Sequence, residues 1–161
     1  MEIRYITRTG AFMPGYKGHL AGAVFLGFIA IGILVWFGLL AGDPRQLLVL
    51  GILIILGALF PDVDTDSKGQ NLFYALLAAF DLGLMICGYY KWAAILGFFA
   101  MLPAVGRHRG WTHTWWAMLA VPLPVIILPY IFYAQELSVL LPYYPAMVFG
   151  YFTHLLLDRT F

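Results

Sequence analysis

Six long runs of apolar residues, separated by short polar breaks, make up most of the chain. A helix needs roughly 20 apolar residues to cross a bilayer, and fewer where its ends lie within protein. The second and fourth runs are short, and prolines interrupt the fifth and sixth. The pattern predicts an all-α fold, a polytopic membrane bundle of about six transmembrane helices. The predicted spans are residues 20–41, 46–60, 71–90, 92–105, 114–134 and 139–157.

The composition extends this membrane assignment to the whole chain. Of the 161 residues, 63% are hydrophobic and 11% are charged, whereas soluble domains carry about 25% charged residues. We therefore expect a single integral membrane domain over residues 1–161, with 1–19 as an N-terminal cytoplasmic segment. No basic stripe points to nucleic acid, and the single cysteine, Cys87, excludes an intramolecular disulfide and a cysteine-based metal site. The expected partner is the lipid bilayer, and the oligomeric state is left open.

Lysine and arginine fall unevenly on the two sides of the predicted bundle. With the N-terminus inside, seven of the nine basic residues lie on the inner side, and only Arg45 and Lys91 lie on the outer side. Cytoplasmic loops carry the excess of basic residues in membrane proteins, so we place both termini in the cytoplasm. All four histidines then fall on the cytoplasmic face, together with a group of aspartates.

Three of these aspartates follow the second apolar run, in the segment FPDVDTDSKG at residues 60–69. If the segment is a turn or extended, Asp62 and Asp64 point the same way and can hold one or two cations. It is not an EF-hand loop, because Ser67 and Phe73 stand where that loop needs Gly and Glu. The alternative is a solvated loop in which Asp62 or Asp64 caps the next helix.

The segment HLLLD, residues 154–158, places a histidine and an aspartate four residues apart. Residues at this spacing share one face of a helix, so His154 and Asp158 are close enough to share a metal. The alternative is a pair of membrane-interface residues that form hydrogen bonds with their neighbours. The same alternative applies to His19, which precedes the first span.

The segment HRGWTH, residues 108–113, contains two more histidines. We expect His108 to lie in a loop and His113 to open the next helix. Arg107 and Arg109 beside them suit an anionic group, because a guanidinium binds phosphate through two hydrogen bonds. The alternative is that the arginines only set the topology and the histidines are interface residues.

Taken together, these residues form a mixed set of imidazole and carboxylate ligands on one membrane face, where ionisable groups are costly and usually functional. Such a set suits Zn²⁺, or else Mn²⁺, better than Mg²⁺ or Ca²⁺. We expect one to three divalent ions. The predicted metal ligands are His19, Asp62, Asp64, His108, His113, His154 and Asp158.

The order of these motifs resembles the YdjM-type family of membrane-bound metal-dependent hydrolases. The matching elements are His19, PDVD at 61–64, HRGWTH at 108–113 and HLLLD at 154–158, which together extend over nearly the whole chain. One departure is Thr114, which stands where a serine is common. The metal-site pattern of that family is grouped with zinc-dependent phospholipase C and P1 nuclease. The resemblance therefore implies phosphoester hydrolysis at two or three metals, in a multi-pass protein of a prokaryotic cell membrane.

The resulting hypothesis is a membrane-embedded metal-dependent hydrolase that cleaves a phosphoester of a lipid or another anionic substrate. A metal-activated water would attack the phosphorus while the ion stabilises the developing charge. The predicted catalytic residues are Asp64, His113 and Arg109. Arg107 and Arg109 would bind the anionic group of the substrate.

Two rival functions remain. A lipid phosphatase with a histidine nucleophile shares the His-x-x-x-Asp spacing, but its other motifs are absent from the chain. A divalent-cation transporter, or a metal-binding membrane protein without hydrolase activity, is the main alternative. Transporters usually place their ligands near the bilayer midplane, where this chain has only Asp81. We expect Asp81 to be a protonated, hydrogen-bonded packing residue, or else part of an ion path.

Overall fold

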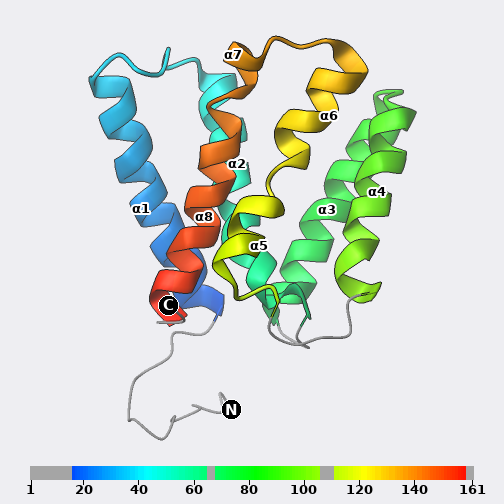
Figure 1. The fold of residues 1–161 in the computed structure, drawn as a ribbon, viewed down its shortest axis with the longest axis horizontal. Helices are drawn as coiled ribbons and strands as arrows, with labels where there is room; N and C mark the ends of the chain where they lie inside the picture. The colour runs from blue at the N-terminus through cyan, green and yellow to red at the C-terminus, as the bar shows by residue number, and fades with distance from the viewer. Residues whose placement is uncertain (1–15, 65–67, 106–110, 159–161) are drawn as a thin grey trace, which may run out of the picture.

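The computed structural model describes residues 16–64, 68–105 and 111–158, and every regular element in these ranges is helical (Figure 1). The predicted all-α class is therefore confirmed. The elements are α1 (Tyr16–Trp36), α2 (Pro44–Leu59), the short 3-10 helix η1 (Phe60–Asp64), α3 (Lys68–Ile86), α4 (Tyr90–Val105), α5 (Trp115–Ala120), α6 (Pro124–Tyr133), α7 (Leu137–Leu140) and α8 (Tyr143–Asp158).

Each predicted span contains a helix, and successive spans run alternately up and down the bundle (Figure 1). Within the described residues, four helical stretches are long and apolar enough to cross a membrane: Lys17–Trp36, Pro44–Val63, Lys68–Ile86 and Trp115–Tyr133. This agrees with a multi-pass membrane protein. The helices α4 and α8 have only 16 residues each, so a full crossing by these two stays a prediction.

Glycines end two helices earlier than the apolar pattern predicts. The first helix ends at Trp36 rather than at residue 41, because Gly38 adopts a φ of 69° and closes the last turn with the hydrogen bonds of a Schellman motif. Gly88, with a φ of 79°, ends α3 at Ile86 rather than at residue 90 in the same way. Apolar residues continue beyond each cap, so hydrophobicity alone overestimates the helix length.

Prolines divide the fifth and sixth predicted spans. Pro122 separates α5 from α6, and Pro142 separates α7 from α8, because proline lacks an N–H and clashes with the preceding helical turn. The carbonyl of Leu119, in the last turn of α5, accepts a hydrogen bond of 2.9 Å from the Tyr144 hydroxyl. This hydrogen bond within the protein stabilises the break between α5 and α6, because a bilayer offers no water to bond the carbonyl.

The helices α2 and α8 cross in direct backbone contact. A Cβ added at Gly57 would collide with the carbonyl of Met147, and one added at Gly150 would collide with the carbonyl of Ile54. Small residues permit such a close approach between membrane helices. The crossing brings the C-terminal ends of α2 and α8 together at the lower end of the bundle in Figure 1.

Large apolar side chains cover much of the outside of the bundle. Phe28 is 82% exposed and Trp36 is 86% exposed, which would be costly against water but is favourable against lipid tails. The exposed surface therefore supports the membrane location that the composition predicts.

Candidate metal centre

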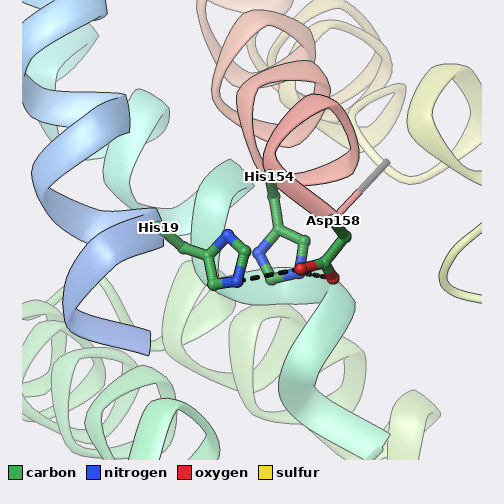
Figure 2. Close-up of side chains that lie close together, drawn as sticks. All are labelled: His19, His154 and Asp158. Carbon is green, nitrogen blue, oxygen red and sulfur yellow. Dashed lines mark ion pairs between the residues drawn. The ribbon is translucent and has the colours of Figure 1, made fainter. Parts of the chain in front are cut away.

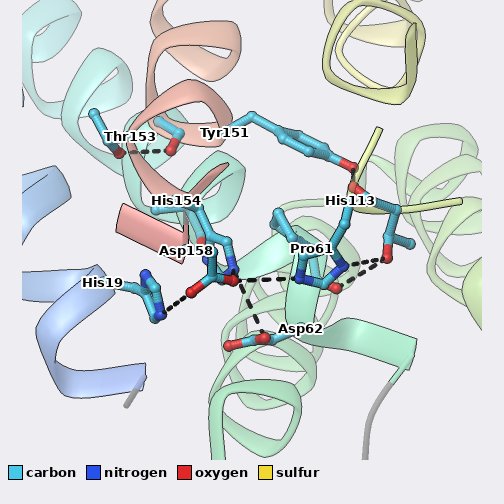
Figure 3. Close-up of polar contacts among 11 residues, drawn as sticks. His19, Pro61, Asp62, His113, Tyr151, Thr153, His154 and Asp158 are labelled. Atoms are coloured by element: carbon cyan, nitrogen blue, oxygen red, sulfur yellow. Dashed lines mark hydrogen bonds and ion pairs between the residues drawn. The ribbon is translucent and has the colours of Figure 1, made fainter. Parts of the chain in front are cut away.

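Five of the predicted ligands meet at one end of the bundle (Figure 3). His19 comes from the first turns of α1, Asp62 from η1, and His113 from the turn that precedes α5. His154 and Asp158 come from the end of α8. Four segments that are distant in sequence therefore contribute side chains to one cluster at one end of the bundle.

Asp158 lies at the centre of this cluster, with histidines around both carboxylate oxygens. Its Oδ1 is 3.0 Å from the Nε2 of His19, and its Oδ2 is 3.1 Å from the Nε2 of His154 (Figure 2). The Nε2 of His113 lies 3.5 Å from the same Oδ2. The rings of His19 and His154 stack with their centroids 4.1 Å apart. One carboxylate thus contacts three imidazoles.

The surroundings of Asp158 favour its ionised form. Burial alone would raise the pKa of the carboxyl group, but the imidazoles of His113, His154 and His19 outweigh this effect and hold the pKa well below its usual range. The carboxylate is therefore charged at any physiological pH. A permanent negative charge among imidazoles is a favourable environment for a cation.

His154 presents a specific nitrogen to the cluster. The residue is fully buried, and its Nδ1 lies 2.7 Å from the carbonyl oxygen of Ala58. A carbonyl can only accept, so Nδ1 carries the proton and the Nε2 of the neutral imidazole presents a lone pair. This Nε2 faces Asp158 and Asp62, whose Oδ1 lies 3.7 Å away, yet it forms no hydrogen bond within the described part of the chain.

A lone pair held against two carboxylates is repulsive unless a cation or a proton lies between them. The ligand distances fit a metal ion. In a tetrahedral zinc site with bonds of about 2.1 Å, the ligand atoms lie roughly 3.4 Å apart. The four contacts between histidine and aspartate atoms range from 3.0 to 3.7 Å.

Two overlapping triads bring their ligand atoms within 4.8 Å of one another. Each contains His154, so its single available nitrogen allows only one of the two triads to be complete at a time. The first triad is His19, His154 and Asp158, and the second is Asp62, His113 and His154.

Asp64 ends η1, and its side chain lies outside the described part of the structure. The turn or extended conformation expected for this segment is instead a 3-10 helix. Residues two apart in a 3-10 helix point in different directions, because it has three residues per turn. The backbone therefore does not direct Asp62 and Asp64 the same way, which corrects that expectation. Arg107, His108 and Arg109 lie outside the described residues.

Asp81 lies in α3 and belongs to neither triad. Its Oδ1 is buried and has no hydrogen-bond partner among the residues that the structure describes. The hydrogen bond expected for a packing residue is therefore not seen at this oxygen.

Three residues next to the cluster do not follow from the sequence patterns. Ala58 contributes a backbone carbonyl, which no side-chain motif reveals. Thr112 and Tyr151 are both fully buried and form hydrogen bonds beside His113. Signals for these two exist in the sequence: Thr112 lies within HRGWTH, and Tyr151 precedes His154 by three residues, on the same helix face.

The family model described as YdjM inner membrane protein matches residues 15–160 of the chain. No curated protein and no solved structure matches it. The matched region contains all five residues of the cluster, from His19 to Asp158.

Proposed function

The chain belongs to the family of YdjM inner membrane proteins, and from its cluster of histidines and aspartates we propose that it is a membrane-embedded metal-dependent hydrolase. The proposed substrate is a phosphoester of a lipid or of another anionic molecule. Zn²⁺ is the proposed ion, with Mn²⁺ as the alternative, because the ligands combine imidazole nitrogen with carboxylate oxygen.

One observation carries the metal-binding part of this proposal. The Nδ1 of His154 donates to the carbonyl of Ala58, so its Nε2 is the nitrogen that faces Asp158 and Asp62 and can bind a cation in place of a proton. Metal-ligating histidines typically donate their second ring nitrogen to a carbonyl or carboxylate in this manner. A buried nitrogen that faces two carboxylates in this way is a suitable metal ligand.

The proposed roles follow from position in the cluster. His154 would hold the ion together with His19 and Asp158, or together with Asp62 and His113. When bound, such an ion supplies Lewis acidity and activates water for attack near neutral pH. The permanently ionised Asp158 orients the imidazoles around it.

Substrate binding and catalysis involve residues beyond the described part of the cluster. Asp64 is proposed to assist His113 in catalysis. Arg109, with Arg107, is proposed to bind the anionic group, because guanidinium matches phosphate in shape and charge.

The location of the cluster favours an enzyme over a transporter. Its residues lie at the ends of α1, α2 and α8 and at the start of α5, rather than in mid-helix (Figure 1). Transporters usually coordinate ions near the midplane of broken helices. A site at the end of the bundle lies near the level of lipid headgroups, where a phosphoester of a lipid is present.

The first experiment measures metal content and hydrolysis in the same preparation. Wild-type protein, His154→Ala and Asp62→Asn would be purified in detergent and assayed by elemental analysis. Activity would be measured on bis(p-nitrophenyl) phosphate and on vesicles that contain phosphatidic acid. Asp43→Asn is the matched control, because Asp43 is exposed at the far end of α2 and asparagine caps a helix equally well.

We expect stoichiometric zinc in wild type and in the Asp43→Asn control, and at least tenfold less in the two cluster variants. Activity should vanish with EDTA and return with Zn²⁺. The absence of bound transition metal from wild type, or equal binding by all four proteins, would overturn the metal site. Bound zinc without hydrolysis of either probe would refute the proposed chemistry and favour a binding or transport role.

A further inference from the structure

Thr112 connects His113 to the turn that carries Asp62. Thr112 is fully buried, and its hydroxyl donates a hydrogen bond of 3.1 Å to the carbonyl of Pro61, the residue before Asp62. The same hydroxyl lies 3.2 Å from the Nδ1 of His113. These hydrogen bonds are drawn as dashed lines in Figure 3.

The chemistry of a hydroxyl decides the direction of the second bond. A threonine hydroxyl has one proton, and the carbonyl of Pro61 can only accept it. Towards His113 the hydroxyl oxygen must therefore accept, so the Nδ1 of His113 carries a proton. The Nε2 of the neutral ring is then unprotonated, and this is the nitrogen that faces Asp158.

We propose that Thr112 is a positioning residue that fixes His113 in the Nδ1–H tautomer and so directs its Nε2 lone pair into the cluster. The tautomer assignment stands on the hydrogen bonds alone. Its effect on zinc affinity rests on the proposed function. Partners of this kind change metal affinity without touching the ion, because they set the orientation and basicity of the ligand.

Tyr151 anchors this arrangement to α8. Its hydroxyl donates a hydrogen bond to the backbone carbonyl of Thr112, and its side chain is fully buried. Tyr151 lies three residues before His154 on the same helix. Through Thr112, the segments that carry Asp62, His113 and His154 are therefore joined by hydrogen bonds.

The arrangement around His113 matches that around His154. In both histidines the Nδ1 donates to a group outside the cluster, the Thr112 hydroxyl or the Ala58 carbonyl, and the Nε2 faces Asp158. The Nδ1 of His19 is different, because it is buried and has no partner within the described residues. Two of the three imidazoles thus have a fixed direction.

The test compares Thr112→Val, which keeps the shape but removes the hydroxyl, with Thr112→Ser, which keeps the hydroxyl. Thr153→Val is the matched control, because Thr153 is also buried and, within the described residues, its hydroxyl donates to the Gly150 carbonyl rather than to a cluster residue. Nitrogen-15 NMR of histidine-labelled, metal-free protein at alkaline pH reports which ring nitrogen is protonated. The His113→Gln variant assigns the signal. Zinc affinity is measured in parallel by competition with a chromophoric chelator.

We expect His113 to be the Nδ1–H tautomer in wild type, Thr112→Ser and Thr153→Val, and a mixture of tautomers in Thr112→Val. Zinc affinity should fall roughly 10- to 100-fold in Thr112→Val and stay within about twofold of wild type in the other two variants. An unchanged tautomer in Thr112→Val, or an equal loss of affinity in Thr153→Val, would overturn the role of Thr112. If wild type binds no zinc, the proposed function fails, whereas the NMR result still decides the tautomer.

Discussion

The Nδ1 of His154 lies 2.7 Å from the carbonyl oxygen of Ala58, a residue 96 positions earlier in the chain. This contact exists because α2 and α8 cross at Gly57 and Gly150 with their backbones in direct contact. The helix crossing and the ligand geometry are therefore one structural feature. Substitutions at the crossing should affect the site even though neither glycine belongs to it.

Gly150→Ala should destabilise the protein and weaken zinc binding together. Its Cβ would collide with the backbone carbonyl of Ile54, and backbone cannot move aside as a flexible side chain can. Overpacking of this kind costs about 1–3 kcal/mol, and separation of the helices would lengthen the bond between His154 and Ala58. Thermal unfolding in detergent measures the loss of stability, and competition with a chelator measures the loss of zinc affinity.

Gly51→Ala, in the partner helix α2, is the control for this experiment, because no neighbouring atom among the described residues lies within 4 Å of a Cβ at Gly51. Alanine also has the higher helix propensity, so this variant should match or exceed wild type in stability. Equal behaviour of Gly51→Ala and Gly150→Ala would show that the close crossing does not constrain the site.

Zinc should stabilise the folded protein, because its proposed ligands come from four separate segments of the chain. An ion that binds only the folded state adds about 2.7 kcal/mol at a free concentration 100 times its Kd. We expect the unfolding temperature of wild type to fall on treatment with EDTA and to recover with Zn²⁺. His154→Ala should unfold at the same temperature with and without zinc, and a full response to zinc in this variant would remove His154 from the ligand set.

Thr114→Ala should loosen the start of α5. Thr114 is the N-cap of this helix, since its hydroxyl accepts a hydrogen bond from the N–H of Ala117 and donates one of 2.6 Å to the carbonyl of Trp111. Loss of an N-cap costs about 1 kcal/mol, and because His113 directly precedes the cap, zinc affinity should also decrease. Thr114→Ser keeps the hydroxyl and should behave as wild type in thermal unfolding and zinc titration. A Thr114→Ser variant as unstable as Thr114→Ala would mean that the methyl group, not the cap, is what matters.

Asp158 should make the stability of the metal-free protein depend on pH in the acid range. In the unfolded chain an aspartate takes up a proton near pH 3.9, whereas the imidazoles hold the pKa of Asp158 lower in the folded protein. Its stabilising contribution is therefore complete above the unfolded pKa and is lost as the pH falls towards the folded one. We expect wild type to be more stable than Asp158→Asn at pH 6, with the difference shrinking below about pH 4. Thermal unfolding of EDTA-treated wild type and Asp158→Asn across this pH range measures the difference in stability. A difference that grows as the pH falls would contradict the lowered pKa of Asp158.

The sequence by itself determined the membrane setting and most of the cluster. Apolar runs fix the class because a bilayer excludes any backbone that is not hydrogen-bonded internally, and the bias of Lys and Arg assigns the loops to faces. His19, Asp62, His113, His154 and Asp158 all followed from motifs placed on one face. Helix ends at Gly38 and Gly88 were missed, because a cap depends on backbone conformation and not on hydrophobicity.

The tertiary structure alone decided how these residues meet. Asp158 receives three imidazoles because α1, α8 and the turn before α5 meet at one end of the bundle, and the crossing of α2 and α8 adds the contact between His154 and Ala58, 96 residues apart. The directions of the His154 and His113 imidazoles depend on the Ala58 carbonyl and the Thr112 hydroxyl, respectively. A motif specifies which side chains are present, but the hydrogen bonds behind them select the nitrogen that faces the site. That selection depends on the packing of the helices, because only packing brings the Ala58 carbonyl to His154 and the Pro61 carbonyl to Thr112.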